Sequence, residues 1–103
     1  MFYSKVVNLP TANTPYLIRT LLLALDPNAP VVLAKALIKA VSTNTGSIAI
    51  GDGTMATVDD GNRLEVAESA EEGREAGLTL ETSAEYLIGS AANQKVLIQG
   101  YTY

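Results

Sequence analysis

The chain has 103 residues, of which 48% are apolar, and its formal net charge is −4. It contains neither cysteine nor histidine, which excludes disulfides, thiolate metal sites and catalysis by histidine. Acidic residues concentrate between residues 52 and 85. This argues against a nucleic-acid partner, because contact with phosphates needs clustered lysine and arginine. Single domains commonly have about 100–150 residues, so we expect one domain spanning residues 1–103.

No segment has the pattern of a membrane span or a secretion signal. The longest apolar run, Leu21–Leu25, is far shorter than the roughly 20 residues that a membrane helix needs. The first residues form no long apolar stretch and are followed by no small-residue cleavage site. We therefore expect a soluble protein that is made in the cytoplasm and has no membrane partner.

The first part of the chain predicts one strand and one helix. Phe2–Leu9 is rich in aromatic and β-branched residues and stops at Pro10, as a strand would. Thr14 followed by Pro15 has the pattern of a helix N-cap and first helical residue. Apolar residues then recur at i, i+4 and i+8, so we expect a short helix over about residues 15–25.

The stretch from Val31 to Val41 is ambiguous. Its alanines and lysines favour a helix, while the alternation of its apolar residues fits a strand nearly as well. From Ser42 onward, short alternating segments are separated by glycine and Asx turns about every ten residues, which is typical of a sandwich or barrel. The sequence thus predicts a mainly β fold, a single antiparallel β-sandwich (jelly-roll-like, or a small barrel) with one short N-terminal helix. Its strands lie mainly at 2–9 and 31–103.

Three segments have residue types that are used in catalysis or ligand binding, but a structural role, as a turn or a solvated surface, explains each of them better. Gly51-Asp52-Gly53 lacks the third glycine and the following helix of a dinucleotide loop, so we interpret it as a tight turn. Asp59-Asp60-Gly61-Asn62 lacks the calcium-loop spacing and predicts a turn whose side chains bond its own backbone. The glutamates of Glu68–Glu75 are most simply a solvated face. We therefore expect no catalytic residue, no cofactor and no metal ion, and a protein that is not an enzyme.

Aromatic residues near the two chain ends are the candidate interface. They are Phe2, Tyr3, Tyr101 and Tyr103, and aromatic side chains are enriched where proteins meet. For Tyr101, packing in the protein's own core remains an equal alternative. For Tyr103 an interface is favoured, because chain ends lie at surfaces. The high apolar content also indicates a homo-oligomer, since monomers seldom expose large apolar patches.

Two segments, Thr43–Gly53 and Tyr86–Ile98, resemble a β-sandwich domain of small virion proteins of tailed bacteriophages. The similarity runs from about Asn44 to Gly100. In order, it consists of an Asn-Thr-Gly turn, a strand that ends in Gly-Asp, an insertion, a strand with an Ile-Gly-Ser end and a final strand. The matching residues are Asn44-Thr45-Gly46-Ser47-Ile48-Ala49-Ile50-Gly51-Asp52, Leu64, Tyr86-Leu87-Ile88-Gly89-Ser90-Ala91 and Gln94-Lys95-Val96.

This resemblance implies a non-enzymatic structural protein of the virion. Small stand-alone relatives look like capsid decoration or cement proteins, which bind the outer capsid surface at junctions between major capsid protein subunits, commonly as trimers. We thus expect the major capsid protein as partner, and a homotrimer or other homo-oligomer. The resemblance also favours a strand over residues 31–41, because related domains have one before the Asn-Thr-Gly turn.

The chain departs from the family in its alanine-rich Val31–Val41 stretch and its acidic Glu68–Glu75 segment, which leaves its position in the virion open. The alternative is a neck, tail or fibre adaptor built on the same sandwich. A carbohydrate-binding sandwich is weaker, because the chain has no tryptophan and few aromatic residues on which a sugar could stack.

Overall fold

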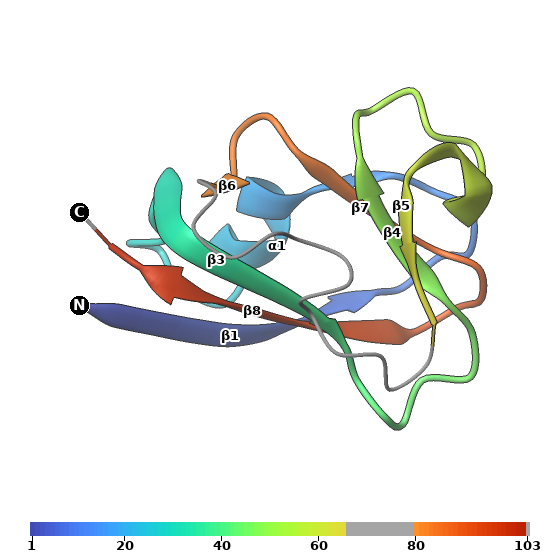
Figure 1. Ribbon diagram of the computed structural model, residues 1–103, viewed down its shortest axis with the longest axis horizontal. Coiled ribbons are helices and arrows are strands. Elements are labelled where there is room, and N and C mark those ends of the chain that lie inside the picture. The colour runs from blue at the N-terminus through green and yellow to red at the C-terminus, as the bar shows by residue number, and fades with distance from the viewer. Residues whose placement is uncertain (66–79, 103) are drawn as a thin grey trace.

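The computed structural model describes residues 1–65 and 80–102. In this part of the chain, two antiparallel sheets of four strands each lie against one another (Figure 1). The first sheet has the order β1-β8-β3-β6 and the second β2-β7-β4-β5. The strands are β1 (Phe2–Leu9), β2 (Tyr16–Leu17), β3 (Val32–Ala40), β4 (Ile48–Gly51), β5 (Asn62–Leu64), β6 (Leu80–Glu81), β7 (Tyr86–Gly89) and β8 (Gln94–Tyr101). Two short helices complete the description, namely α1 (Ile18–Leu23) and the 3-10 turn η1 (Val58–Asp60).

The strand pairing is nested. The first strand pairs with the eighth, the second with the seventh, the third with the sixth and the fourth with the fifth, all antiparallel. This is a jelly roll, in which one long folded hairpin wraps into two facing sheets. The fold is therefore mainly β with one short α-helix in the described residues, and the predicted antiparallel sandwich is confirmed.

The inner faces of both sheets share one core. Alternate residues of each strand point to opposite faces of a sheet, so the buried positions of a strand recur every second residue. In β1 this pattern leaves Val7 and Leu9 fully buried, as the inner positions of a strand. The largest buried core residues come from both sheets and from α1: Leu9, Ile18, Leu22, Leu33, Ile38, Ile48, Leu64, Leu80, Leu87 and Ile98.

The helix is shorter than the sequence suggested. It covers Ile18–Leu23 rather than the whole of residues 15–25, and its N-cap is Leu17, whose side chain makes no capping bond. Thr14 was the predicted N-cap, but the backbone of Tyr16 and Leu17 pairs with β7 instead. The first helical amides donate to backbone carbonyls of the β6–β7 connection, from Ile18 to Glu85 O at 3.0 Å and from Arg19 to Thr82 O at 2.8 Å.

The ambiguous stretch is the strand β3 (Val32–Ala40). Its pairing with β8 shifts between Ala34 and Leu37, which marks a β-bulge. Within the bulge, Lys35 has a φ of 50°, a conformation that an L side chain rarely adopts. Gly100 lies opposite, and a Cβ there would meet the Leu33 Cβ at 2.9 Å and the Ala34 carbonyl oxygen at 3.2 Å.

The outer face of the second sheet is covered by residues of the connection between β4 and β5. Ala49 and Ile88 are neighbours on β4 and β7, and Met55 and Val58 pack over them together with part-buried Tyr86. This second cluster closes one outside face of the sandwich. The outer face of the first sheet has a different character.

Candidate functional site

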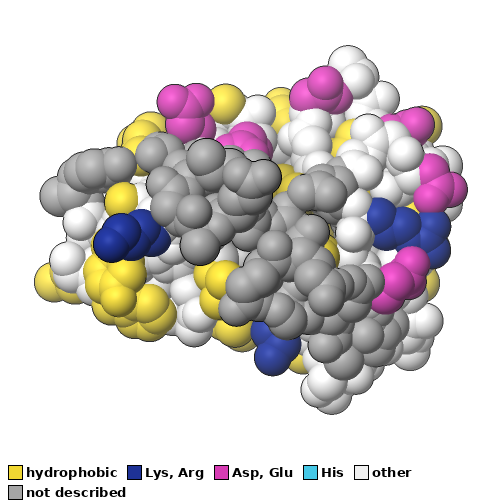
Figure 2. All heavy atoms as spheres, viewed as in Figure 1, with side chains coloured by type: hydrophobic (Ala, Val, Ile, Leu, Met, Phe, Trp, Pro, Cys, Tyr) yellow, Lys and Arg dark blue, Asp and Glu magenta, His cyan; other side chains and the backbone are white. Residues whose placement is uncertain are grey.

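The candidate site is the outer face of the first sheet, where apolar side chains lie in the open. Phe2 and Tyr101 are register partners on β1 and β8, and 53% and 49% of their surfaces are exposed. Their ring centroids lie 5.4 Å apart with planes inclined at 66°, which is the edge-to-face geometry that aromatic pairs prefer. Figure 2 shows apolar side chains gathered where β1 begins and β8 ends.

Three further apolar residues extend this face beyond the aromatic pair. Val6 is 47% exposed and lies opposite Leu97 on β8. Leu37 of β3 is the half-buried neighbour of Gln99. These residues were not predicted as site residues from the sequence. Once it is known which face of each strand points outward, their positions place them on the same face as Phe2. We call Phe2, Val6, Leu37, Leu97 and Tyr101 the outer apolar face.

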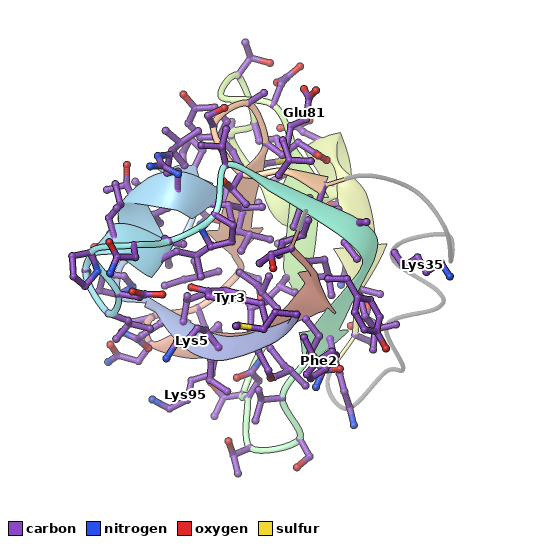
Figure 3. All side chains as sticks on the ribbon, turned by 90° about the vertical axis from the view of Figure 1, so that its left-hand side faces the viewer. Phe2, Tyr3, Lys5, Lys35, Glu81 and Lys95 are labelled. Carbon is purple, nitrogen blue, oxygen red and sulfur yellow. The ribbon has the colours of Figure 1, made fainter. Side chains whose placement is uncertain are left out.

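Tyr3 does not lie on the outer apolar face. It follows Phe2 in β1 and therefore points to the other side of the strand, where its ring packs against the core (Figure 3). Its hydroxyl is buried and has no hydrogen-bond partner among the described residues. Burial raises the pKa of this hydroxyl, and the negative charge of Asp26 raises it further. The structure thus joins Phe2 with Tyr101 and places Tyr3 on the opposite face, whereas Tyr103 lies outside the described residues.

The two segments that carry the family resemblance meet at one end of the sandwich. Asn44 is buried, and its side-chain amide donates to Lys95 O at 2.8 Å while its oxygen accepts from Lys95 N at 2.7 Å. Asn44 thereby acts as one more backbone unit beside β8, next to the Val41 amide that also donates to Lys95 O. The buried Gln94 side chain accepts from Gly46 N at 2.8 Å. Ser90 Oγ accepts from Ser47 N at 2.9 Å.

This corner is a structural joint. It ties the β3–β4 connection to the β7–β8 connection, and both connections cross from one sheet to the other. A Cβ on Gly46 would overlap Ser90 Oγ, so a side chain there would displace the hydroxyl that accepts from Ser47 N. The bonding groups are amides, hydroxyls and backbone atoms, and none of them titrates near neutral pH.

The acidic side chains bond nearby backbone, although the turn predicted at residues 59–62 is instead the end of η1 followed by β5 from Asn62. The Asp52 carboxylate accepts from the backbone and hydroxyl of Thr54, and these bonds lower the pKa of Asp52. The Asp60 carboxylate accepts from Ala56 N at 2.9 Å and Thr57 N at 3.1 Å, which lowers the pKa of Asp60. These carboxylates therefore stabilise turns.

Arg63 adds two exposed ion pairs beside these turns. Its Nη1 lies 2.6 Å from Asp59 and its Nε lies 2.7 Å from Glu65. The hydrogen bonds to Asp59 and then to Glu65 raise the pKa of Arg63. Exposed pairs of this kind contribute little to stability, because water and salt screen them.

Within residues 1–65 and 80–102, the surface has no pocket, and no group of three or more acidic side chains is placed to hold a metal ion. No helix in that part of the chain is long and apolar enough to cross a bilayer. The described residues thus form a jelly roll with the outer apolar face on the outside of its first sheet.

Comparisons with known proteins leave the family open. No protein-family model and no curated protein matches the chain. A solved structure of Bacillus endospore appendages, which form disulfide-linked pili, is similar to this chain. The alignment covers 100% of this chain and 88% of the appendage chain. Its sequence identity to this chain is 17% and its TM-score is 0.44. A likeness at this level carries no argument about what the present chain does.

Proposed function

We propose that this chain is a non-enzymatic structural protein of a tailed-bacteriophage virion. In this proposal it decorates the head, where it binds the outer capsid surface at junctions between major capsid protein subunits. The jelly roll is among the folds that viral capsid proteins use. Fold alone does not determine function, so the proposal depends on the surface.

The outer apolar face is the observation that carries the proposal. Phe2 and Tyr101 are each about half exposed, and exposed apolar patches on soluble proteins mark places where another macromolecule binds. Aromatic anchors supply large contact area at low entropic cost. A protein present in many copies on one particle also needs little energy per copy, because the contacts act together.

The resemblance to phage virion domains supplies the rest of the support. Its two segments contact one another through Asn44 and Gln94, although they lie far apart in the chain. Related sandwiches would keep these residues because the hydrogen bonds of the corner depend on them. The corner therefore gives a structural reason for the resemblance.

The test is a reconstitution on capsids. Purified protein is added to heads of the encoding phage from which this chain has been removed, and binding is measured by co-sedimentation and by cryo-electron microscopy. We expect uptake on the outer shell, loss of uptake for Phe2→Ala combined with Tyr101→Ala, and normal uptake for the exposed turn variant Thr54→Ala. Heads that do not take up the wild-type protein would refute decoration.

Copy number in intact virions separates the two structural roles. A number comparable to that of the major capsid protein supports decoration. A number that matches a single ring supports the alternative, a neck, tail or fibre adaptor. Virions that lack the chain altogether would exclude both.

A further inference from the structure

The strand β1 has a long edge that pairs with no other strand of residues 1–65 and 80–102. It is the first strand of its sheet and pairs with β8 along its whole length, from Phe2 opposite Tyr101 to Leu9 opposite Gln94. The carbonyl of Met1 accepts from Thr102 N at 2.8 Å, which fixes which residues of β1 bond to β8. Antiparallel pairs alternate between bonded and non-bonded, so the even-numbered residues direct their backbone N–H and C=O groups away from β8. These residues are Phe2, Ser4, Val6 and Asn8.

This edge has few of the features that prevent an exposed edge strand from pairing with a strand of another molecule. Natural edge strands are commonly short, bulged, proline-bearing or charged. β1 has eight residues in continuous register and no proline, and Lys5 is its one charged side chain. The other edge strands of the described sheets, β6, β2 and β5, have only two, two and three residues. A strand able to match the whole edge of β1 is therefore another β1.

Self-pairing of β1 has one register that satisfies the outward side chains. A two-fold antiparallel pair must place even-numbered residues opposite even-numbered residues. Centred on Ser4, the pair sets Phe2 opposite Val6 of the second copy, which is a favourable aromatic and β-branched contact. It also sets the two Ser4 residues opposite one another and Tyr3 opposite Lys5.

The charge on Lys5 selects this register. A pair centred on Lys5 would place two like charges directly opposite each other, which destabilises a sheet. A pair centred on Val6 would leave Phe2 without an opposite residue. In the Ser4-centred pair, Lys5 lies opposite the uncharged Tyr3 of the second copy. The Ser4-centred register thus keeps the two lysines from lying directly opposite each other.

We propose that two copies of the chain join β1 to β1 about a two-fold axis at Ser4, so that their first sheets become one continuous sheet. Such a contact is isologous and closes as a dimer. It extends the outer apolar face across both copies, because Phe2 and Val6 lie on that face. The pairing concerns the free protein and is independent of whether the chain binds a capsid. It differs from the trimer implied by the phage resemblance.

Cross-linking at the axis is the most direct test. The chain has no cysteine, so Ser4→Cys introduces a single thiol whose opposite copy is about 5.5 Å away between Cα atoms, within disulfide range. We expect rapid formation of a reducible dimer on mild oxidation. The control is Asn8→Cys on the same edge and the same face, which has no cysteine opposite in this register. Equal rates for the two variants would refute the register.

Sedimentation velocity over a range of concentrations tests the dimer without a cross-link. The wild type is expected to approach twice the mass of one chain. Ser4→Lys opposes two ammonium groups at the axis and should weaken dimerisation by about fivefold. Gln99→Lys adds the same charge to the neighbouring residue on β8 and should leave it unchanged. A wild-type protein that stays monomeric up to millimolar concentration, or a dimer insensitive to Ser4→Lys, would overturn the proposal.

A proline variant separates backbone pairing from side-chain contact. Ser4→Pro removes an N–H that points to the open edge and keeps the bonds between β1 and β8, a position where edge strands tolerate proline. We expect a folded monomer by circular dichroism and sedimentation. A folded dimer of this variant would show that the contact does not use the backbone of β1 at Ser4.

Discussion

Asn44 offers the sharpest test of the joint between the two crossing connections. In Asn44→Ala, two bonds are lost, namely the 2.8 Å bond to Lys95 O and the 2.7 Å bond from Lys95 N. The Lys95 carbonyl keeps the Val41 amide as a partner, but the Lys95 N–H is left without one. Both bonds are part-buried, and a typical bond contributes about 1 kcal/mol net. We therefore expect the free energy of unfolding to fall by about 2 kcal/mol.

Urea denaturation followed by circular dichroism measures this change, at one fixed protein concentration so that self-association is constant. The dependence on urea should stay the same, because the variant changes a joint and leaves the buried surface intact. Asn8→Ala is the matched control, since it removes an exposed amide bond of 3.4 Å to Asn93, and it should cost less than about 0.5 kcal/mol. A loss for Asn44→Ala as small as that of the control would refute the reasoning.

Four further outcomes follow from backbone geometry and charge. Gly100→Ala should destabilise the fold by about 2 kcal/mol in the same assay, because the added Cβ would lie 2.9 Å from another Cβ; an unchanged midpoint would contradict this. Lys35→Gly should stabilise by about 0.5 kcal/mol, since it relieves a φ of 50°, whereas Lys39→Gly in the regular strand should destabilise by about 0.5–1 kcal/mol; a loss in both would argue against strain at the bulge. The lowered pKa of Asp60 means that its contribution is complete at neutral pH and is lost as pH falls below its unfolded value of 3.8. The raised pKa of Tyr3 means that stability is lost as pH rises above 10.0. Asp60→Asn and Tyr3→Phe should flatten the acid and alkaline limbs of a stability profile, and unaltered limbs would contradict these assignments.

The sequence predicted best where local chemistry decides the structure. Phe2–Leu9 is the strand β1 with the expected bounds, because β-branched residues favour a strand and Pro10 cannot extend it. The predicted turn at Asp52 also follows from a side chain that bonds nearby backbone, while Asp60 caps η1 through Ala56 and Thr57 in place of the turn expected at residues 59–62. In each case the deciding contact lies within a few residues.

The prediction failed where distant residues decide. The helix begins at Ile18 because β7 pairs with Tyr16 and Leu17, and no local pattern announces that pairing. The bulge at Lys35 lies opposite a glycine of β8, which a single-strand pattern cannot reveal. At the candidate site, alternation along β1 separates Tyr3 from Phe2. Which of the two rings faces the core depends on the position of β1 beside β8, and the residues of β1 alone do not determine it.

The pairing of β1 with β8 also governs when the protein can fold. Because β8 is the sheet neighbour of β1 among the described strands, a ribosome must have released the chain as far as β8 before the first sheet can assemble. Closing so long a loop is slow compared with forming a local hairpin. During that delay the newly made strand can associate with other nascent chains, so slower synthesis or a chaperone that shields the N-terminal segment should raise the yield of native protein.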